Sequence, residues 1–389
     1  MSGPELTLVI ERLAAGGDGV ARAADGRVVF VPWTAPGDRV RARVVLARKR
    51  FLHASLLEVL RPGADRVEPP CAAFGRCGGC SWQHLSYPAQ LAAKREILRD
   101  ALLRIGHLAL PEAPAFLGSP DPYAYRSRAR LVMQAGRLGY RRAHSQALCP
   151  VEACPVLAPP LQQELSRLVR DPPAEARGEW EIAVGDEGGV RGCVPGPGSG
   201  PRLRLHTPGG PLGVSPGVFF QANRTLRGEL ARRVVEAAGT GELALELYAG
   251  AGFFSLALAR RFTHLLVVES SAAAVQDLRA NLSDARLADV EVHEEDVLRA
   301  LQRRRVRDCS PDCVVLDPPR GGLSTAGALA LAKLRPPRVV YVSCDPATLA
   351  RDLALLVAEG LALESVEGFD LFPHTPHVEA LAVLQRPTP

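Results

Sequence analysis

The stretch RVVYVSCDPATLARDL places a cysteine and an aspartate directly after an apolar run. The run VVYV is continuously apolar and rich in β-branched residues, which is typical of a buried strand in a parallel sheet. Cys344 therefore follows the carboxyl end of a strand, where open α/β sheets bind their ligands. Asp345 and Pro346 are typical N-cap and first-turn residues, so the sulfur also lies near the positive end of a helix.

A cysteine in this place has a use in pyrimidine methylation. Carbon C5 of a pyrimidine is too weak a nucleophile to take a methyl group from a sulfonium, but a thiolate added at C6 produces an enolate whose C5 attacks. A base then removes the C5 proton, and elimination releases the cysteine. Glu379, which begins the last predicted strand in FPHTPHVEALAVL, is the candidate base. Asp317 opens DPPRGG at the end of another strand, where many methyltransferases face the base that they modify.

A second group of residues indicates a nucleotide-binding site. The segment LALELYAGAGFFSLALA predicts a buried strand, then Gly250 and Gly252, then a helix from Phe253. The third glycine of the dinucleotide fingerprint is missing, but Glu269 ends the next strand about twenty residues on and suits a ribose diol. Asp296 ends the third strand and is placed to face an adenine amino group. The alternative is an ordinary buried sheet without a ligand.

Three cysteines cluster in CAAFGRCGGCSWQH, where Cys71, Cys77 and Cys80 have the spacing C-x5-C-x2-C. Thiolates this close, with glycines that let the chain turn, indicate metal ligands. Free core cysteines are the alternative, although two adjacent glycines leave little core there. The spacing differs from the C-x3-C-x2-C of radical enzymes, and the residues alone also allow zinc.

The predicted elements divide the 389 residues into more than one domain. Short strands between turn signals fill residues 5–62, which predicts a small barrel of the oligonucleotide-binding type. A helix is predicted over 90–104. Residues 120–215 contain strand-like pieces, a helical stretch near 159–169, and the turn-rich VPGPGSGP, which we interpret as a hairpin or linker. After about residue 216, strands and helices alternate, which predicts a doubly wound sheet.

Composition and charge favour a folded protein that meets nucleic acid. The chain is 47% hydrophobic and 23% charged, with a net charge of +5. Basic residues recur, and the alternation in YRSRAR puts Arg126, Arg128 and Arg130 on one face of a strand. No apolar run reaches the length of a membrane span, so we expect a cytoplasmic protein without membrane contact. Nine cysteines in that compartment favour metal or catalytic roles over disulfides.

Three motifs in order, DPPRGG, VSCDPATLARDL and FPHTPHVE, resemble the signatures of the RNA 5-methyluridine methyltransferases, a class I S-adenosylmethionine-dependent family. The resemblance implies that Cys344 is the nucleophile, that Glu379 is the proton-abstracting base, and that Asp317 lies near the methyl donor and target uracil. The segment PGVFFQANR is similar to a donor-binding motif of that family. The donor site implied by the resemblance consists of Gln221, Tyr248, Gly250, Gly252, Glu269, Asp296 and Asp317. Glu246 and Ala249 depart from the aspartate and frequent cysteine of the family pattern.

The resemblance also covers the cysteine cluster and the first sixty residues. It implies a [4Fe-4S] cluster with Cys154 as its fourth ligand; Cys149 is the nearby rival, and zinc is the less favoured metal. DGRVVFVPW and PGDRVRARVV resemble the TRAM domain, an RNA-binding barrel. The ribosomal RNA branch of the family generally has both features and the transfer RNA branch generally lacks them, so the expected substrate is 23S ribosomal RNA.

The expected fold class is therefore α/β: a Rossmann-like class I methyltransferase domain, an N-terminal OB-fold barrel and a central α+β domain that carries the iron–sulfur cluster. The expected domains are residues 1–62, residues 68–88 with 120–215, and residues 89–119 with 216–389. We expect a monomer. Two alternatives stay open. The first is an enzyme that methylates another RNA, such as transfer RNA, or another atom. The second is an inactive iron–sulfur RNA-binding protein.

Overall fold

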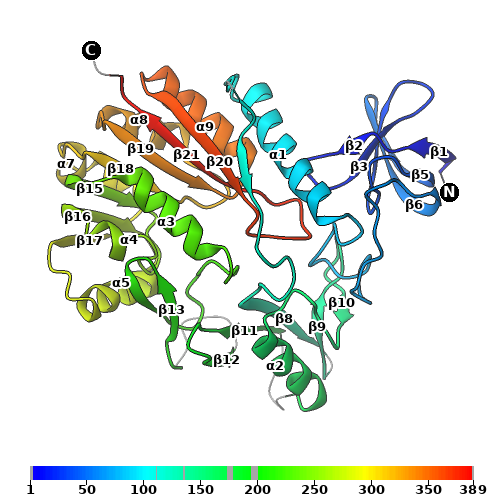
Figure 1. Cartoon of the computed structure of the whole chain (residues 1–389), viewed down its shortest axis with the longest axis horizontal. Helices are drawn as coiled ribbons and strands as arrows, with labels where there is room; N and C mark the ends of the chain where they lie inside the picture. Colours follow the sequence, from blue (N-terminus) through cyan, green and yellow to red (C-terminus); the bar gives the residue numbers. More distant parts are fainter. Residues whose placement is uncertain (1–2, 111, 135, 173–177, 194–199, 388–389) are drawn as a thin grey trace.

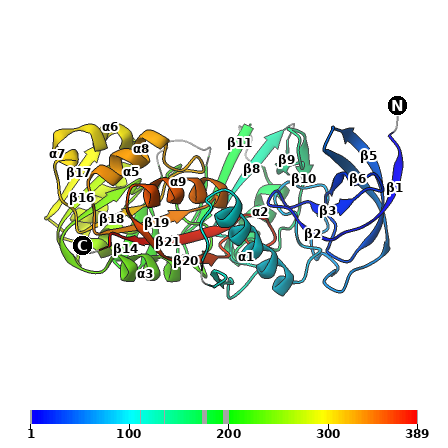
Figure 2. The ribbon, with the colours of Figure 1, turned by 90° about the horizontal axis from the view of Figure 1, so that it is seen from above.

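The computed structural model describes residues 3–110, 112–134, 136–172, 178–193 and 200–387, and its three large sheets follow one another along the chain (Figure 1). Seen from above, the molecule is elongated, with the N-terminal sheet at one end and the C-terminal sheet at the other (Figure 2). The middle sheet and helix α1 (Tyr87–Arg104) lie between them.

The N-terminal sheet is a curved, six-stranded half-barrel, as the short strands over residues 5–62 predict. Its order is β1-β5-β6-β4-β3-β2. Alternate residues of β5, such as Val40 and Ala42, are buried, because successive side chains of a strand point to opposite faces. The strands are β1 (Glu5–Val9), β2 (Arg12–Leu13), β3 (Gly19–Arg22), β4 (Val28–Val31), β5 (Arg39–Ala47) and β6 (Phe51–Arg61).

The middle sheet is antiparallel, in the order β10-β9-β8-β11-β12. Helix α2 (Pro159–Arg170) packs on it through Leu161, Leu165 and Leu168, whose spacing puts them on one face of the helix. This helix confirms the prediction near 159–169. The strands are β8 (Arg128–Gln134), β9 (Arg137–Arg141), β10 (Leu148–Pro150), β11 (Gly178–Val184) and β12 (Val190–Cys193).

The C-terminal sheet confirms the predicted doubly wound arrangement. Its order is β17-β16-β15-β18-β19-β21-β20-β7, with the run from β17 to β19 parallel and β21 antiparallel to β19. Its strands are β15 (Gly241–Leu247), β16 (Phe262–Glu269), β17 (Val290–Glu294), β18 (Cys313–Leu316), β19 (Arg338–Ser343), β20 (Ala362–Phe369), β21 (Glu379–Gln385) and the short β7 (Ala115–Leu117). Strands β18, β19 and β21 are almost wholly buried, as is the C-terminal half of β15, which explains their apolar sequences.

Helices cover both faces of this sheet. One hydrophobic core joins the sheet to α1, α6, α8 and α9, and a second joins it to α3, α4, α5 and the hairpin β13–β14. The elements are β13 (Leu203–Thr207), β14 (Gly210–Val214), α3 (Arg227–Ala238), α4 (Ser255–Leu258), α5 (Ala272–Asp284), α6 (Val297–Gln302), α7 (Arg304–Arg307), α8 (Thr325–Lys333) and α9 (Pro346–Ala358). The helix predicted from Phe253 is only the single turn α4, because the next strand already begins at Phe262.

We propose the division into domains 1–62, 68–88 with 120–215, and 89–119 with 216–389. Each sheet has its own cluster of buried apolar side chains, which supports this division. The hairpin β13–β14 packs on α5 of the C-terminal sheet. Most of the turn VPGPGSGP lies outside the described residues. None of the described helices combines the length and the apolar character that crossing a bilayer requires.

Candidate active site

The predicted donor site lies where strands β15 and β16 end side by side, with Leu247 paired to Val268. The Glu269 carboxylate accepts the amides of Gly250 (2.9 Å) and Ser271 (2.7 Å), so it lies against the loop that follows β15. Gly250 has a φ of 57°, and a Cβ placed there would meet nothing within 4 Å. The loop is therefore open to a ligand beside an acid that can bind two hydroxyl groups.

Tyr248 and Asp296 complete this edge of the sheet. Asp296 caps α6, because its Oδ1 accepts the amide of Arg299 at 3.1 Å. Burial, with smaller contributions from the nearby carboxylates of Asp296, Asp352 and Glu269, raises the pKa of Tyr248 to about 12. Asp296 and Glu269 therefore lie on the same side of the sheet as Tyr248, as the sequence predicts.

Glu246 is a residue whose importance the sequence reasoning missed. It is 1% exposed, and neither of its carboxylate oxygens has a hydrogen-bond partner. Burial, with smaller contributions from the charges of Asp317 and Glu269, raises the pKa of Glu246 to about 8, while the Ser255 side chain acts in the opposite direction. The signal in the sequence is an acid inside the apolar strand LALEL, which is costly to bury unless a partner compensates it.

The candidate nucleophile and base lie together because two strands are antiparallel. Ser343, the last residue of β19, pairs with Ala380 of β21. Cys344 and Glu379 are therefore the next two residues to face each other across the strands. Glu379 is 1% exposed and both of its carboxylate oxygens are without a partner. Asp345 caps α9 as predicted, since its Oδ1 accepts the amides of Ala347 and Thr348, both at 2.9 Å.

Three ionisable groups share this place. Burial raises the pKa of Asp317 to about 7. Burial, and then the charge of Asp317, raises the pKa of Glu379 well above its usual range. The pKa of Cys344 rises to about 12 because of burial and the two acids, while Arg320 acts in the opposite direction. Burial and the neighbouring acids therefore favour the thiol form of Cys344, and burial together with Asp317 favours the protonated form of Glu379.

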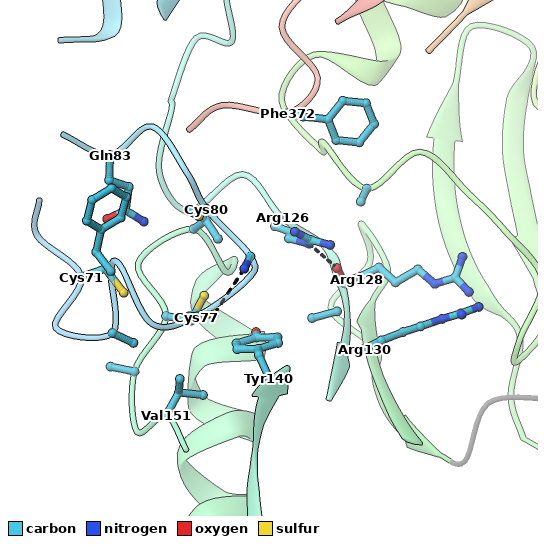
Figure 3. Close-up of a pocket in the computed structure, with 18 of the residues that line it drawn as sticks. Cys71, Cys77, Cys80, Gln83, Arg126, Arg128, Arg130, Tyr140, Val151 and Phe372 are labelled. Carbon is cyan, nitrogen blue, oxygen red and sulfur yellow. Dashed lines mark hydrogen bonds between the residues drawn. The ribbon is translucent and has the colours of Figure 1, made fainter. Parts of the chain in front are cut away.

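The structure brings Gln221 to a cavity of 530 Å³ that also contains the cysteine cluster (Figure 3). Phe372 and Arg320 line the same cavity, so it extends from the cysteines to the DPPRGG motif. Asn223, two residues further on, donates to the carbonyls of Asp370 (3.4 Å) and Leu371 (3.2 Å). The segment PGVFFQANR therefore connects this cavity to the loop that leads to Glu379.

The four predicted ligands Cys71, Cys77, Cys80 and Cys154 all line this cavity. The turn between two of them is fixed, because the Gly79 amide donates to Cys77 Sγ at 3.4 Å (Figure 3). The rival, Cys149, is 2% exposed, belongs to the core of the middle sheet and is absent from the cavity lining.

The thiols influence one another. Burial, with smaller contributions from neighbouring thiols, raises the pKa of Cys77 to about 12 and that of Cys80 to about 11, and burial also raises the pKa of Cys154. The Arg126 guanidinium acts in the opposite direction on the pKa of Cys80 and Cys154. No three His, Cys, Asp or Glu side chains, among the residues that the structure describes, are arranged to hold a single metal ion. The four thiols share the lining of one cavity.

The three predicted arginines have different surroundings. Arg128 is buried, pairs with Glu181 (Nη2 to Oε2, 2.6 Å) and lies over the ring of Phe219 at 5.8 Å. Arg126 donates from Nε to the carbonyl of Arg128 at 2.9 Å, and Arg130 is exposed. Figure 3 shows all three beside the cavity. A surface for an anionic ligand therefore retains the charge of Arg126 and Arg130, while Glu181 compensates Arg128.

A second cavity, of 580 Å³, contains the candidate nucleophile in its lining. The N-terminal sheet, α1 and the segments around Cys344 and His377 line it. His377 also lies 3.4 Å from Arg320, a residue of the first cavity. Cys344 therefore lines a cavity that the half-barrel helps to form, whereas the cysteine cluster lines the cavity that contains Arg320.

Comparisons with known proteins agree with the motifs. The family described as tRNA (Uracil-5-)-methyltransferase matches residues 214–387, and the TRAM domain matches residues 1–57. The 23S rRNA (uracil(1939)-C(5))-methyltransferase RlmD of Halomonas elongata is 36% identical over 98% of this chain and 89% of its own length. The protein of the same name from Chromohalobacter salexigens is 37% identical over 98% of this chain and 90% of its own length.

Among solved structures, the tRNA (uracil-54, C5)-methyltransferase of Pyrococcus abyssi in complex with S-adenosyl-L-homocysteine superposes with a TM-score of 0.77. It is 26% identical and covers 97% of this chain and 100% of its own. The likeness therefore extends over all three sheets and is not confined to the doubly wound one.

Proposed function

We propose, because this chain belongs to the family of S-adenosylmethionine-dependent RNA (uracil-C5)-methyltransferases, that its substrate is 23S ribosomal RNA. Family membership gives the reaction, which is the transfer of a methyl group to C5 of uracil in RNA. The observation that supports the ribosomal substrate is identity above 35% over 98% of the chain with two methyltransferases named for 23S ribosomal RNA. The transfer RNA enzyme that shares the fold is 26% identical.

Cys344 is the proposed nucleophile. It reacts as the thiolate, its proton having passed to solvent: Sγ bonds to C6 of the uracil, and the π electron pair of the C5–C6 double bond moves to form an enolate over C5 and O4. C5 then bonds to the methyl group as the bond between that methyl group and the sulfonium sulfur breaks, which leaves a neutral thioether. Burial and the acids Glu379 and Asp317 raise the pKa of Cys344 to about 12, so we expect substrate and donor binding to promote the thiolate by altering the charges around these acids.

Glu379 is the proposed base. After methylation it takes the proton from C5, the C5–C6 double bond forms again, and the bond from C6 to Cys344 Sγ breaks. Its raised pKa suits this role, because a carboxylate in an apolar site is a stronger base than one in water. Both of its oxygens lack a hydrogen-bond partner, so either is available to accept the proton.

S-adenosylmethionine supplies the methyl group as part of a sulfonium cation. The residues of this chain fit such a donor. Glu269 and the open loop at Gly250 suit its ribose, and the buried, unpartnered Glu246 beside Asp317 suits its positive charge. A bound cation stabilises the ionised forms of these two acids, so donor binding lowers their pKa values. Gln221, Tyr248, Gly252 and Asp296 are proposed as the remaining contacts.

A [4Fe-4S] cluster held by Cys71, Cys77, Cys80 and Cys154 is proposed for the first cavity. Four soft thiol donors suit iron–sulfur chemistry. All four line one cavity, so they can bind one group together, and the family resemblance favours a cluster over a single zinc ion. Methyl transfer involves no oxidation or reduction, so the proposed cluster is structural. We further propose that the protein is a cytoplasmic monomer.

The test of substrate uses purified protein with methyl-labelled S-adenosylmethionine and either 23S or transfer RNA transcripts. The RNA is digested and the labelled nucleoside identified. We expect 5-methyluridine from 23S RNA alone. Label in transfer RNA but not in 23S RNA would contradict the proposal that 23S RNA is the substrate. A labelled nucleoside other than 5-methyluridine would contradict the proposed methylation of uracil at C5.

A further inference from the structure

The loop between β20 and β21, residues 370–378, carries the motif FPHTPH and ends at Glu379. Its position therefore decides where the proposed base stands. The loop contains a strained residue: His374 has a φ of 65°, in the left-handed region that non-glycine residues seldom adopt. Such a conformation persists only when the surrounding contacts fix it.

Gln90, from helix α1, holds His374 from two sides. Its Oε1 accepts the backbone amide of His374 at 2.8 Å, and its Nε2 lies 3.1 Å from His374 Nδ1. Nε2 also donates to the carbonyls of Trp82 (3.2 Å) and Leu85 (3.0 Å). These partners fix the orientation of the amide, because the reverse orientation would point its oxygen at two carbonyls.

The contact between Gln90 Nε2 and His374 Nδ1 requires a neutral imidazole. Burial lowers the pKa of His374 to about 4, so the ring is neutral at neutral pH. In the tautomer that carries its proton on Nε2, Nδ1 accepts a hydrogen bond from Gln90 Nε2. The ring of Tyr123 stacks on it, with centroids 4.3 Å apart. Gln90 is 0% exposed, so no water replaces its hydrogen bonds if they are lost.

The same loop is tied to the cysteine cluster. The amides of Ser81 and Trp82, the two residues after Cys80, both donate to the carbonyl of His374 at 2.9 Å. Trp82 Nε1 donates in turn to the carbonyl of Gly17 in the half-barrel at 2.8 Å. Gln90 thus lies where α1, the segment after Cys80 and the loop meet.

Lys94 secures the start of the loop, one turn further along α1. Its Nζ donates to Asp370 Oδ1 at 2.5 Å and to the carbonyl of Phe372 at 3.0 Å, and both charged side chains are fully buried. The start and the middle of the loop are therefore both fixed by one helix face. The geometry points to Gln90 as a positioning residue for the proton-abstracting carboxylate, an inference that rests on the proposed role of Glu379.

The inference predicts a specific defect. If the loop is loosened, Cys344 still adds to uracil, but removal of the C5 proton slows. The covalent protein–RNA adduct therefore accumulates while turnover falls. A structural role would lower adduct formation and turnover in the same proportion, because it would change only the amount of folded enzyme.

The experiment compares Gln90→Met, which keeps the length of the side chain and removes both hydrogen-bonding groups, with Leu98→Val. Leu98 is buried in α1 two turns away and is not among the residues that bond to His374, so this variant loses core packing alone. Turnover and the denaturation-resistant adduct are measured with the full chain, 23S transcript and S-adenosylmethionine. For Gln90→Met we expect turnover to fall by about tenfold to a hundredfold while the adduct per folded enzyme rises. Leu98→Val should leave the ratio of adduct to turnover unchanged.

His374→Gly is the second variant and guards against a folding defect in the first. Glycine adopts the positive φ without strain and keeps the backbone bonds to Gln90, Ser81 and Trp82, but it removes the ring. We expect a smaller rise of the adduct in the same direction. A proportional fall of adduct and turnover in both Gln90→Met and His374→Gly would overturn the inference. Glu379→Gln tests the role of Glu379 separately from that of Gln90. If this variant failed to accumulate adduct, Glu379 would not be the base, whatever the role of Gln90.

Discussion

Cys344 and the four cavity cysteines are the same chemical group in two different settings. Burial raises the pKa of Cys344, and two carboxylic acids raise it further. Burial also raises the pKa values of Cys77, Cys80 and Cys154, but there the neighbours are other thiols and the cation Arg126. Acids beside a thiol can exchange protons with a substrate, whereas several thiols beside a cation favour a bound metal group. The neighbours, and not burial, distinguish the two roles.

The largest expected effect is that of removing the nucleophile. Cys344→Ala should abolish methylation, because no other group at this strand end can add to C6 of uracil. Cys309→Ala, which changes a half-buried thiol outside both sites, is the control and should keep full activity. Residual turnover by Cys344→Ala, measured by label transfer to RNA, would refute the proposed chemistry.

Next in size is the dependence on pH. Attack needs the thiolate of Cys344 and elimination needs the carboxylate of Glu379; the pKa of each is raised. Below a raised pKa, the reactive form of each group increases as the pH rises. The rate of methylation should therefore increase from about pH 6 to about pH 9, by up to tenfold per unit where one ionisation limits it. A rate that is flat or decreasing over this range would mean that substrate binding does not leave these groups protonated.

The cluster ligands give a smaller and partial effect, and they sharpen the contrast. Cys154→Ser should lose most of the bound iron and lower the melting temperature, because metal binding contributes folding free energy. Cys149→Ser should keep its iron, since that thiol faces the core. Iron and sulfide analysis of both variants decides between the two ligands. Iron loss in Cys149→Ser alone would reverse the assignment.

The smallest effect concerns the cation beside the nucleophile. Arg320 lowers the pKa of Cys344, so Arg320→Gln should slow adduct formation by about threefold to tenfold. Lys333→Gln, at the exposed end of α8, is the matched loss of charge and should change nothing. The rate of adduct formation in a single turnover is the measurement. Equal effects of the two substitutions would show that only the net charge matters.

The sequence was sufficient for the parts of the fold that rest on local patterns. Alternating strands and helices predicted the doubly wound sheet, and the Asp345 cap with Pro346 predicted the start of α9. Strand-end placement likewise brought Glu269 and Cys344 to the correct edge. The glycine-rich loop was less clear, and the expected helix from Phe253 is a single turn because the following strand begins early.

What the sequence could not give is contact between distant segments. Gln90 and Lys94 read as polar positions of an ordinary helix, and only the fold shows that they are fully buried against the loop before Glu379. Glu246 appeared as a departure from a family pattern, while its missing partners are visible only in three dimensions. The antiparallel pairing of β19 and β21, which joins Cys344 to Glu379, also depends on a long-range register.

The most direct test is to identify the residue bound to RNA when elimination is blocked. Glu379→Gln is incubated with 23S transcript and S-adenosylmethionine, the adduct is digested with protease and nuclease, and the cross-linked peptide is sequenced by mass spectrometry. The account predicts that the modified peptide contains Cys344, joined to a methylated uridine. An adduct on any other cysteine, or normal turnover with no adduct, would contradict it.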